Sequence, residues 1–334
     1  TYQASGEIGN QVSSILAERR DGASGISFAG VKINGIEMKD GRVPLFEDSA
    51  ASAGPEKRVG VFLNGLGGFG SLDSSAQTTG LDFHNGGLIA GVDYRFSDHV
   101  IAGASFNWIR TDTTYDGNLG EATSDGYGGS LYASVFGESA YLDGLFNYTY
   151  TDYEMKRNIS GVGTNKGSPH SSQLFFSMRT GYLLPEEPWM GGFRFGPLAR
   201  LDVVQIWMAK YSESGTALAL DFDKYNITSV TTNLGADLSY GIEMGSVVLT
   251  PRIYGMWVHE FENDAQDINV APVLSPTTPI TTTLVSPDRN FGRLGAEISL
   301  DLDGGVAIYF DYEAIVGLKN VESNQFGLGG RIQF

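Results

Sequence analysis

The amino-acid sequence predicts an all-β membrane protein, an outer-membrane barrel of about 12 antiparallel strands with an N-terminal α-helix in its lumen. Three observations favour this fold class. Apolar and polar residues alternate along most of the chain, the connections between these segments are tight and long in turn, and the chain ends on an aromatic residue of an apolar face. Alternation at period two is the pattern of a strand with two unlike faces.

The C-terminal segment 321–334, VESNQFGLGGRIQF, shows the alternation most clearly. One of its faces is polar and carries Arg331. The other face is apolar: Phe326, Leu328, Ile332 and Phe334. In an outer-membrane barrel lipid covers the apolar face of each strand and a watery lumen takes the other.

The amino-acid composition further narrows the class of protein to which this chain can belong. The chain of 334 residues has 45 Gly, 16 Tyr and 19 Phe, and it contains no apolar run of the roughly 18 residues that a transmembrane helix needs. The net charge of −17 argues against a nucleic-acid partner, because phosphate binding needs clusters of Lys and Arg. The chain opens on Thr1 without a charged-then-apolar leader, so we expect that any export signal was removed or lies outside this sequence.

Twelve segments carry the strand pattern, an even number, as is usual for single-chain outer-membrane barrels. They are 58–69, 81–96, 100–110, 127–137, 140–153, 171–184, 192–210, 225–240, 247–261, 289–301, 305–317 and 321–334. A soluble β-sandwich or lipocalin-like fold also alternates, but its strands are usually about 5–6 residues long. The longer segments here fit tilted membrane strands better.

The connections between these segments indicate the orientation of the barrel. Tight turns are expected at 97–98, 138–139, 243–245 and 303–304, and long loops at 112–120, 154–170 and 262–288. This asymmetry is typical of periplasmic turns and external loops. Trp108, Trp207 and Trp257 fall toward the loop-side ends of their strands, where an interfacial girdle of aromatic residues is expected. The Pro- and Thr-rich stretch 264–288 predicts a mobile, extended external loop.

The segment before the first strand contains a predicted helix at 7–20, EIGNQVSSILAERR. Apolar residues recur at helical spacing, an acidic residue lies near its start and two arginines lie near its end. At 1.5 Å per residue it spans about 20 Å, most of the ~25 Å apolar band of such a barrel. The pore-helix candidates are Glu7, Ile8, Asn10, Gln11, Val12, Ile15, Leu16, Arg19 and Arg20.

We expect residues 1–57 to be a helix and linker threading the pore, and 58–334 to be the transmembrane barrel. The alternative is a helix packed beneath the barrel. The polar faces of the strands carry both charge signs, and such a lining can hold a helix without burying unpaired charge. The lumen-lining candidates are Arg179, Arg194, Arg200, Arg252, Arg293, Glu297, Asp311, Glu313 and Arg331, with Asp143 and Asp202 on the same faces.

The order of these features resembles a known family, the translocator (β) domain of classical autotransporters in type V secretion. A helix, a linker, about 12 strands and a terminal Phe follow one another in that family's order. The local sequences that carry the resemblance are VFLNGLGGFG, GGLIAGVDYRF and GLGGRIQF. The resemblance implies an outer-membrane translocator of a Gram-negative bacterium, which supports export of an N-terminal passenger, absent here, and whose helix plugs the pore afterwards.

The same resemblance implies the partners. They are outer-membrane lipid, the passenger, and the outer-membrane barrel-assembly machinery, which would read the terminal strand through Phe326, Leu328, Ile332 and Phe334. We expect a monomer without cofactor. The alternative function is a passive diffusion porin or small-solute channel, which has no need for an amphipathic helix before its first strand.

Catalytic chemistry is not expected. Some relatives cut their passenger at one of two adjacent Asn residues in the helix, but this chain has Gly9, Asn10 and Gln11 there, and Asn10 reads as a residue near the helix cap. The 4 His are scattered, so neither a nucleophile with its base nor a metal site emerges.

Overall fold

The computed structural model describes residues 2–21, 58–75, 78–137, 139–182, 184, 193–245, 247–262, 266–284, 288–302 and 304–334. The expected linker at 22–57 therefore lies outside the described residues, as do Glu138 and Asp303 of the expected turns.

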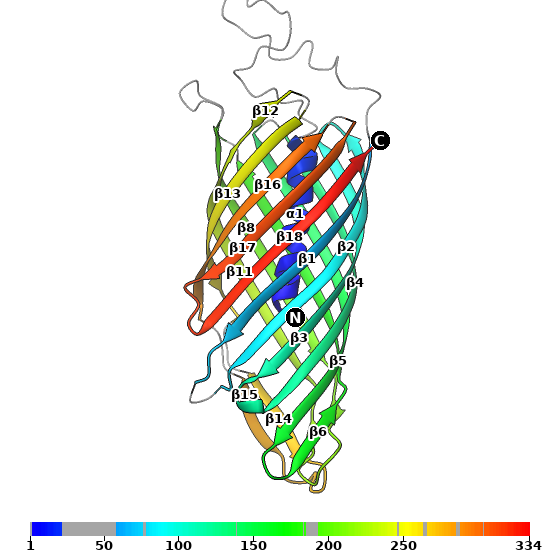
Figure 1. Cartoon of the computed structure of the whole chain (residues 1–334), viewed down its shortest axis with the longest axis vertical. Coiled ribbons are helices and arrows are strands. Elements are labelled where there is room, and N and C mark those ends of the chain that lie inside the picture. The colour runs from blue at the N-terminus through cyan, green and yellow to red at the C-terminus, as the bar shows by residue number, and fades with distance from the viewer. Residues whose placement is uncertain are drawn as a thin grey trace, which may run out of the picture.

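Among the described residues, 12 long strands close into an antiparallel barrel (Figure 1). The strands are β1 (Val59–Leu72), β2 (Leu81–Ser97), β3 (Val100–Tyr115), β4 (Gly120–Phe136), β5 (Ala140–Ile159), β7 (His170–Tyr182), β8 (Phe193–Met208), β11 (Tyr225–Tyr240), β13 (Val247–Glu260), β16 (Asn290–Leu302), β17 (Val306–Val316) and β18 (Val321–Gln333). The barrel closes where β1 pairs with β18, from Gly60 opposite Gln333 to Leu72 opposite Val321. A short strand, β12 (Ile242–Met244), extends the ladder beside β13.

The predicted strands are all present, and several extend beyond their predicted ends, most of all β3, β4 and β5. β3 continues to Tyr115 and β4 starts at Gly120, so the expected loop 112–120 is wrong for most of its length. β5 continues to Ile159 and returns as β6 (Gly163–Gly167), so the expected loop 154–170 is also wrong. Polar strands that continue past the membrane keep their backbone hydrogen bonds, but they lose the apolar half of the alternating signal.

A second, four-stranded sheet lies at the end of the barrel opposite the chain's C-terminus (Figure 1). It consists of β9 (Tyr211–Ser212), β10 (Leu220–Phe222), β14 (Gln266–Pro272) and β15 (Ile280–Leu284). We call it the loop-end sheet, because the long connections meet there, and we call the opposite end the turn end. The expectation of an extended loop at 264–288 is therefore wrong, since β-branched residues such as those of β15 favour strand pairing.

Ionic contacts join the loop-end sheet to the extended hairpin of β5 and β6. Arg157 of β5 donates from Nε to Glu213 Oε1 at 2.9 Å, and its Nη2 donates to the carbonyl of Leu218 at 2.9 Å. Nearby, the ring of Tyr211 stacks on Phe222 at 4.6 Å, and burial raises the pKa of the Tyr211 hydroxyl above its usual value. These contacts make the loop end an ordered, packed structure.

The two faces of the barrel differ as the alternation predicts. Outward-facing apolar side chains are exposed, for example Leu63 at 58%, Leu131 at 65% and Leu328 at 61%. Trp207 and Trp257 are also exposed, near the loop-end termini of β8 and β13. The inward-facing side chains are largely buried, because the N-terminal helix fills the lumen.

The lumen is filled by helix α1 (Tyr2–Asp21), which lies inside the barrel with its last turn toward the turn end (Figure 1). It begins five residues earlier than predicted (position 2 against 7) and ends one residue later (21 against 20). Among the described residues no helix is both long and apolar enough to cross a membrane.

Candidate functional site

The apolar stripe of α1 packs against the inner wall of the barrel. Ile8, Val12, Ile15 and Leu16 are each no more than 1% exposed. They belong to one cluster of buried residues that includes the wall residues Phe62, Tyr132, Phe175 and Tyr309. Full burial of such a side chain is worth about 1.5–3 kcal/mol, so the stripe alone gives the helix a strong preference for the wall over a water-filled lumen.

Gly9 allows α1 to pass close to β7 and β8. A Cβ at this position would lie 2.5 Å from Nη2 of Arg200 and 3.0 Å from the ring of Phe175. Real Cβ atoms do not approach other atoms that closely, because the interior is already packed to contact distance. A side chain at this point of the helix would therefore require Arg200 and Phe175 to shift.

Arg19 anchors the last turn of α1 to the wall. Its Nε donates to Asp93 Oδ1 at 2.8 Å, and both side chains are 1% exposed. Its Nη2 donates to the backbone carbonyl of Arg58 at 2.9 Å, and its Nη1 donates to Gln333. A buried Arg needs both a counter-charge and partners for its remaining donors, and this site provides them.

Arg20 makes a second anchor on the neighbouring part of the wall, formed by β4 and β5. Its Nη1 lies 2.5 Å from Asp143 Oδ1 and 3.2 Å from Ser134 Oγ. Its guanidinium also lies over the ring of Tyr141, 3.9 Å from the centroid. The two consecutive arginines therefore bind carboxylates of β2 and β5 and hold the helix at two points of the wall.

Two arginines of the wall bind backbone carbonyls of the helix. Arg95 donates from Nη2 to the carbonyl of Arg19 at 2.6 Å, and Arg331 donates from Nη1 to the carbonyl of Ile15 at 3.0 Å. The carbonyl of Arg19 belongs to the last turn, where carbonyls lack partners within the helix and carry partial negative charge, whereas that of Ile15 lies one turn earlier. Cationic donors at this end therefore stabilise the helix where it stands.

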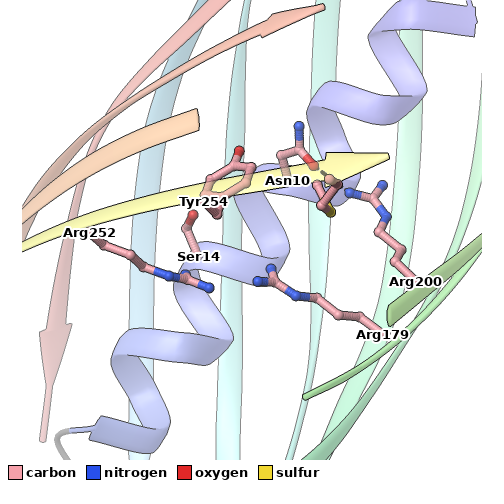
Figure 2. A pocket seen from close by; sticks show the side chains of 7 residues that line it. Asn10, Ser14, Arg179, Arg200, Arg252 and Tyr254 are labelled. Carbon is pink, nitrogen blue, oxygen red and sulfur yellow. Dashed lines mark hydrogen bonds between the residues drawn. The ribbon is translucent and has the colours of Figure 1, made fainter. Parts of the chain in front are cut away.

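The middle of α1 faces a small polar cavity, shown in Figure 2, with about 10 Å³ of accessible volume, roughly the space of one water molecule. Its lining comes from Asn10, Ser14, Arg179, Arg200, Arg252, Tyr254 and Met256. Ser14 donates to Glu297 Oε2 at 2.9 Å, and the side-chain oxygen of Asn10 accepts from Nη1 of Arg200.

Three arginines of the wall are paired with carboxylates of the wall. Arg200 binds Asp202 at 2.7 Å and Arg293 binds Glu313 at 2.8 Å. Arg252 lies 2.5 Å from Asp237 and 3.6 Å from Glu297. A lumen with balanced charges can be dehydrated around a helix at a far lower cost than one with unpaired charges.

The structure places the predicted site residues as follows. The described pore-helix side chains from Ile8 to Arg20 are turned to the wall or the cavity, and the side chain of Glu7 lies outside the described set. The lumen candidates lie on the inward faces of β7, β8, β13, β16, β17 and β18, with Arg194 at the turn end of β8. The four terminal-strand residues Phe326, Leu328, Ile332 and Phe334 face outward and are 41–66% exposed.

Sequence reasoning missed three wall residues that touch the helix or its contacts, namely Asn64, Asp93 and Arg95. The signal was present in the alternation. Asp93 and Arg95 alternate with Val92, Tyr94 and the following Phe in GVDYRF, and an outward apolar face implies inward polar residues.

The ring of His259 lies among aromatic side chains. His259 lies between the rings of Trp257 and Phe261 on one face of β13, whereas Glu260 lies on the other face and accepts from Val230 N at 2.9 Å. In the part of the chain that the structure describes, no three His, Cys, Asp or Glu side chains gather in a way that could hold a metal ion.

Comparison with known proteins agrees with this geometry. The family model for the autotransporter beta-domain matches residues 61–313, which is most of the chain. The translocator domain of the autotransporter NalP from Neisseria meningitidis has the same fold, with a TM-score of 0.66 at 15% identity over 86% of this chain and 91% of that one. The beta domain of the Bordetella autotransporter BrkA gives a TM-score of 0.63 at 18% identity, over 83% of this chain and 100% of that one.

Among curated proteins, an uncharacterized protein in the trpE-trpG intergenic region of Pseudomonas putida is 26% identical over 209 residues. That match covers 60% of this chain and 34% of the relative, so the chain spans about a third of the relative's length. Since the family model covers most of the barrel, and the barrel with its N-terminal helix has the fold of solved translocator domains, the chain belongs to the autotransporter beta-domain family.

Proposed function

We propose that this chain exports an N-terminal passenger to the cell surface and that α1 plugs the pore afterwards. Autotransporter beta-domains are outer-membrane translocators of Gram-negative bacteria, and they are transporters rather than enzymes. The observation that carries the proposal is α1 itself, which lies in the lumen and is held there by Arg19 and Arg20.

The direction of α1 supports export toward the loop end. Its last turn contacts Arg58, which directly precedes β1 at the turn end, so its first turn points toward the loop-end sheet (Figure 1). A segment that precedes α1 in the chain would therefore leave the barrel on the loop side, which we assign to the cell exterior. In this proposal residues 1–57 are the helix and linker of the pore, and 58–334 are the transmembrane barrel.

A diffusion porin fits these observations less well. An open channel keeps a hydrated lumen, whereas here buried ion pairs join the inserted helix to the wall. We infer a binding role for Asn10 rather than a cleaving one, because its side-chain oxygen accepts from Arg200.

The partners follow from the same proposal. Lipid covers the apolar outer face of the barrel, and the barrel-assembly machinery reads the terminal strand through its exposed apolar residues. The barrel has no free sheet edge, since β1 pairs with β18, and we propose that it acts as a monomer.

The proposal is tested with a secreted fusion that carries an epitope-tagged, unstructured passenger before residue 1. We expect protease added to intact cells to remove the epitope, while the barrel remains folded and heat-modifiable on gels. The matched control is the same fusion with 58–334 deleted, which should keep the epitope protected. A folded barrel whose epitope stays protected in the periplasm would contradict export.

A further inference from the structure

One residue of α1, Gln11, occupies a closely fitted slot where the barrel closes. Its side-chain Nε2 donates to both carboxylate oxygens of Asp311, at 2.8 and 3.0 Å, and its Oε1 accepts from Asn64 Nδ2 at 3.1 Å. The oxygen of Asn64 in turn accepts from the hydroxyl of Tyr309. Gln11, Asn64 and Tyr309 are each no more than 1% exposed, and Asp311 is half-buried.

Two glycines of β18 create the space for this slot. A Cβ on Gly327 would lie 2.0 Å from Nε2 of Gln11 and 2.5 Å from Oδ1 of Asp311. A Cβ on Gly329 would lie 2.2 Å from Oδ1 of Asn64. The wall is therefore shaped to receive an amide at one height along the pore.

No helix residue on the same face can replace Gln11 if α1 slides. The neighbours three and four residues away are Glu7, Ile8, Ser14 and Ile15. An isoleucine in the slot would leave Nδ2 of Asn64 and the carboxylate of Asp311 without the partners that Gln11 gives them, which is costly. A glutamate would add a carboxylate beside Asp311, and like charges at such distances repel.

Ser14 is the remaining neighbour, and it is a poor substitute. Its single hydroxyl offers one donor on a short side chain, whereas the amide of Gln11 donates and accepts at the same time. Ser14 also already binds Glu297 in the observed position. The slot therefore distinguishes the observed position of α1 from one that is a single turn, about 5.4 Å, away.

We propose that Gln11 and its slot set the register of α1, and so fix the point at which the exported chain comes to rest. Gln11 is then a positioning residue, and the Arg19 and Arg20 anchors supply holding strength at that position. This inference rests on the proposed function, because it concerns where the transported chain stops.

The register can be measured by cross-linking, because the chain has no Cys of its own. A Glu297→Cys background is combined with one further substitution, Asn10→Cys, Ser14→Cys or Ala17→Cys, and the barrel is treated with a short bifunctional thiol reagent. Ser14 Oγ lies 2.9 Å from Glu297 in the observed register, and the two other positions report displacement by about one turn either way. All arms carry the same change at 297, so its effect cancels.

We expect the chain with Gln11 to give the product at position 14. Gln11→Leu should lower the ratio of this product to the products at 10 and 17 by about tenfold, since hydrogen bonds to a charged group are lost. The matched control is Ser13→Ala, because Ser13 is buried in the same turn and makes no hydrogen bond to the described residues. This control should leave the ratio unchanged.

A second variant changes only the wall. Gly327→Ala should displace the flexible end of Gln11 and lower the ratio in the same way. Gly330→Ala is its control, since a Cβ there meets its nearest atom, the carbonyl oxygen of Ala307, at an ordinary 3.6 Å. A ratio that stays unchanged in both Gln11→Leu and Gly327→Ala overturns the register role alone. If the chain that keeps Gln11 gives no cross-linked product at any of the three helix positions, the proposal that α1 plugs the pore is overturned.

Discussion

Asp93 offers the sharpest test of how α1 is held in the pore. The substitution Asp93→Asn keeps the shape of the side chain and removes its charge. Arg19 would then lose the carboxylate that binds its Nε, at a site where its side chain is 1% exposed, while its contacts to Arg58 and Gln333 remain. Loss of one partner from a buried ion pair costs about 3–5 kcal/mol.

This cost affects only the state in which α1 is bound in the lumen, because a helix that has left this position exposes Arg19 to water. Each 1.4 kcal/mol is a factor of ten in an equilibrium. The fraction of channels whose helix has left its seat should therefore rise by roughly 10²–10³-fold. Planar-bilayer recording measures this fraction directly, as the share of time spent in the large-conductance state.

Two further chains separate this effect from a general loss of stability. Asp125→Asn removes a carboxylate that pairs with Arg110 near the loop end, away from the helix, and should leave the open fraction unchanged. Adding Arg19→Met to Asp93→Asn removes the stranded charge and should return the open fraction to within about tenfold of the unmodified chain. A folded Asp93→Asn barrel that stays as closed as the unmodified one would refute the anchoring argument.

Three other predictions concern separate parts of the molecule. Phe334→Asp should lower the yield of heat-modifiable barrel in cells, because Phe334 belongs to the proposed assembly signal at the end of the terminal strand, and unchanged assembly would count against that role. Gly9→Ala should raise the open fraction in bilayers, since its Cβ meets Arg200 at 2.5 Å, and a variant as closed as the unmodified chain would show that the helix can pass there with a side chain. Glu213→Gln should make protease added to intact cells cleave the protein faster within residues 209–224, because Arg157 loses its charged partner at the loop-end sheet. An unchanged cleavage rate would mean that this ion pair does not hold the sheet.

The barrel could be predicted from the sequence because every membrane strand has to satisfy lipid on one face and the lumen on the other. Because of this requirement, apolar and polar residues alternate along each strand. The predicted bounds 225–240 therefore match those of β11 at both ends. The requirement no longer applies beyond the membrane, where β5 continues with residues such as Lys156 and Arg157. The loop-end sheet was therefore missed, since pairing between distant short segments leaves no local signal.

The site divides in the same way. The apolar stripe of α1 and the inward charges of the wall follow from periodicity, so the components of the pore could be named. Their pairing could not, because Arg19 meets Asp93 and Gln11 meets Asp311 across 74 and 300 positions of sequence. Which polar residue faces which depends on the axial position and rotation of the helix, and no single segment encodes either.

Single-channel conductance of the full chain, compared with a chain that lacks residues 1–21, measures whether α1 closes the pore. We expect small or closed currents from the full chain and large, steady currents after the deletion, because α1 occupies the lumen. Large, steady currents from both chains would contradict it, since the helix would then lie outside the conducting path and the barrel would act as an open porin.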